Sequence, residues 1–157
     1  MTKTNAARIL DRLKISYELK TYAVDESDLT AGHVADLIGL PTRQVFKTLV
    51  ARTDQRDIVL GCIPGDSELD TKSLGGFCGG KRADLVHVKE VQALTGYIRG
   101  GVSPLGSRKP LPVYLDQSAR LWDIISISAG QRGIQILLAP ADLIMATGAI
   151  ACEITRK

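Results

Sequence analysis

The sequence has no long hydrophobic run and no hydrophobic segment near its N-terminus. None of its apolar runs approaches the roughly 20 residues that a membrane-spanning helix needs. The first residues, Met1 to Arg8, contain no apolar core of the kind found in a signal peptide. We therefore expect a cytoplasmic protein with no membrane partner.

Cysteine and histidine are also scarce. The chain has three widely spaced cysteines, which form no Cys-x-x-Cys pair, and two histidines without a His-x-x-x-His spacing. This pattern indicates neither a disulfide framework nor a zinc site. Nothing in the sequence ties His33 or His87 to a serine or cysteine, so a structural role is favoured for both over a catalytic one. The sequence thus predicts no metal, no cofactor and no histidine-activated nucleophile.

The charge balance is weakly basic. With 157 residues, of which 45% are hydrophobic, the chain is expected to form a single domain over 1–157 with an ordinary core. The net charge of +3 tolerates a polyanionic partner without demanding one. The basic residues fall into small groups, each of which alone is typical of a solvated surface: Lys81 with Arg82, Arg99 with Arg108 and Lys109, and Arg132.

Helical and strand-like hydrophobic patterns occur in turn along the chain. They predict helices at 5–13, 30–38, 89–95 and 141–146, a short helix capped by Asp70, and strands at 16–22, 45–51, 58–63, 83–88, 113–116, 123–128, 134–139 and 150–154. The polar turns 54–57 and 129–133 each join two of these strands into an expected hairpin. Because hairpins mix with helices and no regular βαβ order occurs, we predict an α+β domain with a mixed, mostly antiparallel sheet.

A glycine-rich loop and a lysine in an apolar run are the main signs of a binding site. The loop, residues 96–106, contains four glycines, one serine and one proline but a single charge. Such a loop can present backbone N–H groups to a carbonyl oxygen, an oxyanion or a phosphate, although a plain turn has the same composition. Lys47 either points to solvent or provides a cation inside a cavity. Thr48 would point to the opposite face of the strand.

A second glycine pattern points away from nucleotide chemistry. Residues 75–81 match Gly-x-x-x-x-Gly-Lys, but Arg82 stands where a phosphate-binding loop needs serine or threonine to hold magnesium. The residues before Gly75 are polar and do not form a buried strand. The sequence therefore argues against nucleotide hydrolysis.

Three segments taken together are specific: Val45-Phe46-Lys47-Thr48-Leu49, the loop Gly96-Tyr97 with Gly100-Gly101-Val102-Ser103-Pro104-Leu105-Gly106, and Ser128-Ala129-Gly130-Gln131-Arg132-Gly133. They resemble the hallmark segments of the YbaK family of free-standing aminoacyl-tRNA editing proteins. The resemblance extends over nearly the whole chain. It implies the fold of the editing domain of bacterial prolyl-tRNA synthetase, with a curled sheet and surrounding helices.

The resemblance implies a trans-editing hydrolase for mischarged tRNA, with Cys-tRNA(Pro) as substrate. The partners would be the tRNA acceptor end and, as a plausible helper, prolyl-tRNA synthetase. Catalytic roles are implied for Lys47, which would lie near the ester, and for Gly100 and Gly101, whose loop would surround the ester carbonyl with N–H groups. Substrate-binding roles are implied for six further residues: Tyr22, Thr48, Ser103, Pro104, Ser128 and Gln135.

In this family a cysteinyl substrate is thought to attack its own ester with its thiol, which fits the missing catalytic triad. The chain departs from the family at Gln135 and Leu137, where many cysteine-specific members have Asp and Glu. Two alternatives stay open: deacylation of another small aminoacyl group such as alanyl or seryl, and non-catalytic binding of tRNA acceptor ends or of a synthetase.

Overall fold

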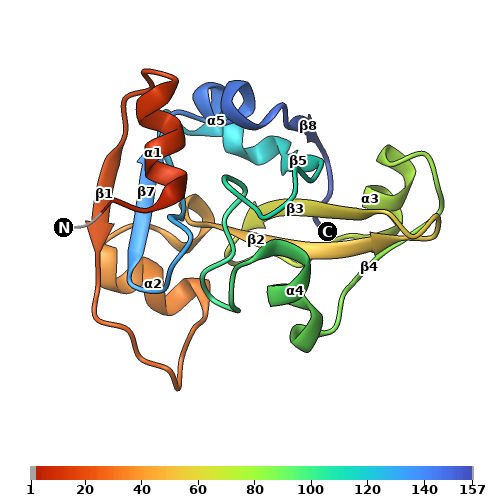
Figure 1. Cartoon of the computed structure of the whole chain (residues 1–157), viewed down its shortest axis with the longest axis horizontal. Coiled ribbons are helices and arrows are strands. Elements are labelled where there is room, and N and C mark those ends of the chain that lie inside the picture. Colours follow the sequence, from red (N-terminus) through yellow and green to blue (C-terminus); the bar gives the residue numbers. More distant parts are fainter. Residues whose placement is uncertain (1–2, 157) are drawn as a thin grey trace.

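A computed structural model describes residues 3–156, and Figure 1 shows how the elements are arranged. In this part of the chain eight strands form two sheets, one with the order β1-β7-β6 and one with the order β4-β2-β3-β5-β8. The strands are β1 (Glu18–Thr21), β2 (Phe46–Thr53), β3 (Ile58–Pro64), β4 (Ala83–Leu85), β5 (Val113–Asp116), β6 (Ile125–Ser128), β7 (Ile134–Leu138) and β8 (Ile150–Cys152).

Helices surround the two sheets, in agreement with the expected α+β class. The α-helices of residues 3–156 are α1 (Asn5–Arg12), α2 (Ala31–Ile38), α3 (Thr71–Phe77), α4 (Val91–Thr95) and α5 (Pro140–Thr147). Three short 3₁₀ helices accompany them: η1 (Thr42–Gln44), η2 (Val88–Glu90) and η3 (Gln117–Leu121).

The helix ends follow the signals in the sequence. The side chains of Thr4, Thr30 and Asp70 each accept a hydrogen bond from the backbone N–H three residues further along, at the starts of α1, α2 and α3. Gly39 ends α2 in the left-handed conformation, with φ of 77°. These local contacts explain why the helix positions could be predicted.

The predicted elements differ from the structure mainly between residues 83 and 95. The strand expected at 83–88 stops at Leu85, and the helix expected at 89–95 is divided into η2 and α4. The Glu90 carboxylate accepts a hydrogen bond from the N–H of His87 at 3.1 Å, so a helical turn begins where the strand pattern still continues. The short helix η3 was not predicted.

The sheet topology is mostly antiparallel, as predicted. The pairs β1–β7, β6–β7, β2–β3 and β2–β4 are antiparallel, whereas β3–β5 and β5–β8 are parallel. The expected single sheet is two sheets, which meet at one bridge between Val45 and Ser126. Beyond this bridge, side chains of both sheets line a cavity instead of continuing the pairing.

The largest hydrophobic cluster joins both sheets to α1 and α5. It includes Leu10 of α1, Leu60 of β3, Ile127 of β6 and Leu143 of α5, all fully buried. A smaller cluster packs Val34, Ala35 and Ile38 of α2 against Val45, just before β2. Both sheets and α2 are therefore held firmly around the start of β2.

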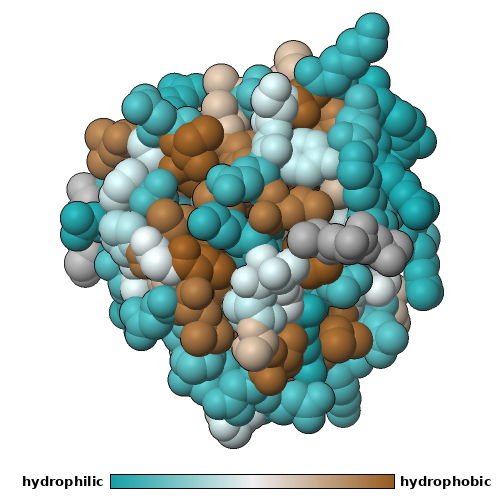
Figure 2. Space-filling view, turned by 90° about the vertical axis from the view of Figure 1, so that its left-hand side faces the viewer, coloured by the Kyte–Doolittle hydropathy of each residue, from teal (hydrophilic) through white to brown (hydrophobic). Residues whose placement is uncertain are grey.

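The side of the molecule formed by β1, α1 and α2 shows hydrophobic groups between polar ones (Figure 2). Leu13, Val24 and Leu37, which belong to these elements or follow them directly, are about half exposed. Scattered apolar side chains are normal on a folded surface. No helix within residues 3–156 has the length and apolar character needed to cross a membrane.

Two glycines of segment 75–81, Gly75 and Gly80, have a packing role in the structure. Gly75 lies in α3, and a β-carbon there would collide with the backbone of Arg82. The Asp54 carboxylate accepts a hydrogen bond from the N–H of Lys81 at 3.1 Å. The pattern thus fits close contact between α3 and the start of β4.

Candidate functional site

A cavity of about 540 Å³ opens between the two sheets, α2 and α4. Most of its walls are apolar, and its polar side chains include Thr30, Lys47, Thr48, Ser128 and Gln135. None of the described residues that line it is an aspartate or a glutamate. The lining residues are Leu29, Thr30, Ala31, Val34, Val45, Phe46, Lys47, Thr48, Leu49, Val50, Gly65, Leu85, Val86, Val88, Val91, Arg99, Gly100, Val102, Ser128 and Gln135.

The cavity runs along an uncovered edge of β2. All six consecutive residues from 45 to 50 line it, although the side chains of a strand point alternately to its two faces. The reason is that β4 is short and pairs with β2 only over residues 51–53. The edge of β2 before Val50 is thereby left to the cavity.

The backbone of Thr48 points to this edge. The Val45 carbonyl accepts a hydrogen bond from the N–H of Gly65, whereas the Val50 carbonyl accepts one from Val86 on the other side of the strand. Hydrogen-bonding groups alternate between the two sides along a strand, so the N–H and C=O of Thr48 share the side of Val50. They are placed to bind the polar atoms of a ligand.

Lys47 lies in the cavity wall and is half-buried. Its Nζ donates a hydrogen bond to the Gly65 carbonyl at 3.3 Å. Burial lowers the pKa of Lys47, and the charges of Asp66 and Glu68 oppose this effect only in part. Of the two possibilities left open by the sequence, the structure therefore favours the cation inside a cavity.

Thr48 lies on the opposite face of β2 from Lys47, as predicted, and packs against the core. Its Oγ1 is 3.5 Å from the Sγ of Cys62, its partner across the β2–β3 pair. Cys62 is fully buried, and burial raises the pKa of its thiol to about 11. The same effect raises the pKa of the Cys152 thiol to about 11. Neither thiol is poised to be a nucleophile.

The glycine-rich loop places one of its two predicted catalytic glycines in the cavity. Gly100 lines it with φ of 85°, and no acceptor within residues 3–156 is hydrogen-bonded to its N–H. Gly101 does not line the cavity, and its N–H donates to the Ile98 carbonyl at 2.9 Å. A β-carbon on Gly101 would lie 3.2 Å from the Cα of Gln131, so this glycine packs the loop against the β6–β7 turn.

Ser128 and Gln135 add two polar groups to the wall formed by β6 and β7. The Gln135 Oε1 accepts a hydrogen bond from the Ser126 hydroxyl at 2.8 Å, while Gln135 itself is 5% exposed. This contact fixes the amide and leaves its Nε2 as the end that can donate to a ligand. The Ser128 hydroxyl accepts a hydrogen bond from the N–H of Gly130 at 3.1 Å and can still donate its proton.

Three predicted substrate-binding residues lie behind the cavity walls. Ser103 is fully buried and accepts a hydrogen bond from the N–H of Leu105 at 3.2 Å, and Pro104 is buried beside it. Tyr22 packs against the α2 cluster, and its N–H donates to the Gly133 carbonyl at 3.0 Å. These residues shape the loop and the wall, and their contact with substrate stays a prediction.

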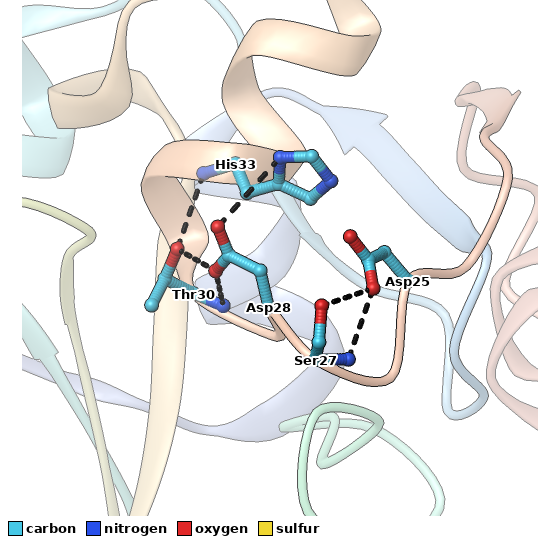
Figure 3. Close-up of polar contacts among 5 residues, drawn as sticks. All are labelled: Asp25, Ser27, Asp28, Thr30 and His33. Carbon is cyan, nitrogen blue, oxygen red and sulfur yellow. Dashed lines mark hydrogen bonds and ion pairs between the residues drawn. The ribbon is translucent and has the colours of Figure 1, made fainter.

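The segment between β1 and α2 forms a further wall, and local hydrogen bonds hold its shape (Figure 3). Asp25 accepts hydrogen bonds from the N–H and hydroxyl of Ser27, and Asp28 accepts them from the same groups of Thr30. These bonds lower the pKa of both carboxyls. His33 lies outside the cavity, with its Nδ1 3.8 Å from Asp28.

Sequence reasoning did not identify Gly65 or Arg99 as part of the site. Gly65 follows a proline at the end of a strand and looks like an ordinary turn glycine, so the sequence carried no signal for it. Arg99 had a signal, because it is the single charge of the segment 96–106. Within residues 3–156, no group of three histidine, cysteine, aspartate or glutamate side chains could hold a metal ion.

Comparisons with known proteins show the family of the chain. The model of the family described as "Aminoacyl-tRNA editing domain" matches residues 25–146. A protein of Enterococcus faecalis named "Putative Cys-tRNA(Pro)/Cys-tRNA(Cys) deacylase EbsC" is 41% identical over 155 residues, which cover 99% of this chain and 94% of that protein.

Two further similarities are informative. The Escherichia coli "Multifunctional Ser/Thr-tRNA deacylase ProXp-y" is 28% identical over 113 residues, which cover 69% of this chain and 68% of that protein. A solved structure, "Crystal structure of a putative trans-editing enzyme for prolyl tRNA synthetase", superposes with a TM-score of 0.83 at 25% identity. The match covers 99% of this chain and 100% of that one.

Proposed function

Because the chain belongs to the aminoacyl-tRNA editing domain family, we propose that it is a trans-editing deacylase for mischarged tRNA, with Cys-tRNA(Pro) as its substrate. One observation carries the proposal. Lys47 brings a half-buried cation into a cavity that also contains the Thr48 strand edge and the N–H of Gly100, which has no acceptor within residues 3–156. Such donors stabilise the negative charge that develops on an ester carbonyl during hydrolysis.

The proposed reaction needs no nucleophile from the protein. The thiol of the cysteinyl group attacks its own carbonyl carbon, and the sulfur–carbon bond forms as the ester bond to the ribose oxygen breaks. The thiol proton goes to the leaving ribose oxygen, and water then opens the cyclic thiolactone to free cysteine. The protein contributes orientation and carbonyl polarisation, which together can supply much of the rate enhancement. The raised pKa values of the Cys62 and Cys152 thiols support this division of labour.

A second candidate is deacylation of seryl- or threonyl-tRNA, favoured by the similarity to the Escherichia coli Ser/Thr-tRNA deacylase. The cavity offers neutral hydrogen-bonding groups at Thr48, Ser128 and Gln135, which suit a substrate hydroxyl as well as a thiol. A non-catalytic module that binds acceptor ends through the same cavity is the third candidate.

The deciding experiment is a deacylation assay with purified protein and a panel of cysteinyl-, seryl-, threonyl- and alanyl-tRNA. The proposal is supported if cysteinyl-tRNA is hydrolysed rapidly, the other three aminoacyl-tRNAs are not, and a thiolactone is trapped before it opens. Equal rates on seryl- or alanyl-tRNA rule out the thiol mechanism, because a hydroxyl is a much poorer nucleophile at neutral pH. Binding of tRNA without any hydrolysis identifies the binding module.

Prolyl-tRNA synthetase is the proposed helper. The net charge of +3 is small, so affinity for tRNA alone is expected to be weak and sensitive to salt. Addition of prolyl-tRNA synthetase should therefore lower KM for Cys-tRNA(Pro). The control is an unrelated synthetase at the same concentration.

A further inference from the structure

Two arginines stand together at the mouth of the cavity. Arg99 is exposed and lines the cavity, and its backbone carbonyl accepts a hydrogen bond from the Nε of Arg132 at 2.8 Å. A β-carbon on Gly100, the residue that follows Arg99, would lie 3.3 Å from the Nε of Arg132. The hydrogen bond thus ties the glycine-rich loop to the β6–β7 turn and sets the Arg132 guanidinium beside Gly100.

No carboxylate of the described residues 3–156 forms an ion pair with either of these guanidinium groups. The ion pairs within residues 3–156 join Lys3 to Asp11, His33 to Asp28, Arg52 to Glu90, Arg82 to Asp84 and Arg156 to Glu68. The arginines at the mouth take part in none of them. Both charges are therefore available to a ligand.

Two of the three acidic groups on the facing loop are held by local hydrogen bonds. A β-carbon on Gly100 would lie 3.4 Å from the side chain of Leu29, so the loop before α2 faces the arginines. Of the carboxylates on that loop, Asp25 binds Ser27, Asp28 binds Thr30 and faces His33, and Glu26 is exposed (Figure 3). The local hydrogen bonds keep Asp25 and Asp28 directed at their own loop.

We propose that Arg99 and Arg132 bind the phosphodiester backbone of a single-stranded RNA end, on the 5′ side of the terminal nucleoside. This rests on the proposed function, in which the aminoacyl ester lies near Lys47. The ester is joined to the ribose of the terminal nucleoside, so the next phosphate along the chain must leave the cavity at its mouth. Arginine suits this ligand because its planar guanidinium forms paired hydrogen bonds with phosphate oxygens.

The geometry leaves the right atoms free for this contact. In Arg132 the Nε is occupied by the Arg99 carbonyl, and the two terminal nitrogens, which have no acceptor within residues 3–156, can donate to a ligand. Because the Arg99 carbonyl already holds the side chain of Arg132, this side chain loses less conformational freedom when it binds a phosphate. Arg99 lacks such a contact within the described chain and would close on the phosphate from the other side.

The test compares Arg99→Gln and Arg132→Gln with Arg120→Gln, an exposed arginine of η3 outside the cavity lining. The first ligand is a tRNA acceptor microhelix whose cysteinyl group is attached through a stable amide. Dissociation constants are measured between about 50 and 200 mM salt, the range over which phosphate contacts change affinity strongly. We expect about tenfold weaker binding for each variant at the mouth, and a slope of log K against log salt that is smaller by about 0.7 per lost contact. Arg120→Gln should match the wild type.

The second arm removes the phosphate from the substrate. With the cysteinyl ester of adenosine, which lacks this phosphate, Arg99→Gln should raise KM much less than it does with Cys-tRNA(Pro), for which we expect a rise of about tenfold. Arg132→Lys retains the charge and should retain the salt slope, which separates phosphate binding from loop support. Melting curves identify any variant that has lost its fold.

An unchanged salt slope in Arg99→Gln overturns the inference. A rise in KM for the adenosine ester that equals the rise for Cys-tRNA(Pro) overturns it as well. If the wild type hydrolyses neither ester, the proposed function fails. The arginines are still tested in that case, because the microhelix measurement needs no catalysis.

Discussion

Replacement of Lys47 by methionine should abolish most activity and leave the fold intact. The Lys47 ammonium is the only side-chain cation apart from Arg99 among the described residues of the cavity lining. Loss of one donor to a developing oxyanion typically lowers kcat by about 10²-fold or more, equivalent to roughly 3 kcal/mol. We therefore expect kcat on Cys-tRNA(Pro) to fall at least that far, with a smaller change in KM.

The stability of the same variant should change little, because two effects oppose each other. The variant loses the hydrogen bond from Nζ to the Gly65 carbonyl. It also removes a cation whose pKa is lowered by burial, which means that the folded protein disfavours its charge. The net change should stay within about 1 kcal/mol, or about 4 °C in Tm. Lys72→Met, on the exposed face of α3, is the matched control for the substitution itself.

The pH dependence gives a second readout. The lowered pKa of Lys47 means that wild-type activity, which needs the charged form, declines as pH rises towards the ordinary lysine value of 10.5. In that same window the unfolded chain holds the proton more tightly, so this residue's contribution to stability increases with pH. Lys47→Met should show neither effect. Wild-type turnover in Lys47→Met, or a loss of activity that merely follows unfolding, would refute the reasoning.

Three further predictions concern two glycines at the site and the three cysteines. Gly101→Ala should lower activity about tenfold with a stability loss of about 1 kcal/mol, because the new methyl group meets the backbone of Gln131 at 3.2 Å and displaces the loop. Unfolding without a specific catalytic loss would show that this glycine serves only the turn. Gly65→Ala should destabilise by about 1–3 kcal/mol, because its β-carbon would lie 2.6 Å from that of Ala31, whereas Gly76→Ala, with open space around it, should not. Replacement of all three cysteines by serine should leave kcat nearly unchanged, and a rate that collapses in a folded triple variant would place a protein thiol in the reaction.

The elements of the fold were predictable because their signals are local. Caps at Thr4, Thr30 and Asp70 and the left-handed Gly39 mark helix ends within a few residues of sequence. The division into two sheets was not predictable, because it depends on β6 meeting β2 at a single bridge far along the chain. The strand expected to reach residue 88 stops at Leu85 for a different, local reason: the Glu90 carboxylate accepts a hydrogen bond from the N–H of His87 and starts a helical turn that competes with the strand pattern.

The site shows the same division between local and distant information. Lys47 and Gly100 lie in the cavity as the motifs indicated, and both lie in segments whose composition alone was unusual. Gly101 was predicted with Gly100 as part of the loop whose N–H groups would surround the ester carbonyl, yet its N–H donates to the Ile98 carbonyl. Adjacent residues of a loop present different atoms, and only the backbone path decides which N–H group remains free.

The short length of β4 links the fold to the chemistry of the site. If β4 extended to residue 88, as its sequence suggested, it would continue to pair with β2 and cover the backbone of Thr48. The chain instead turns away after Leu85, and Val86 makes the last hydrogen bond to β2 through Val50. The apolar residues that would have extended the strand, Val86 and Val88, become a cavity wall. The site therefore exists because a strand ends early, which leaves backbone donors and acceptors beside a half-buried lysine.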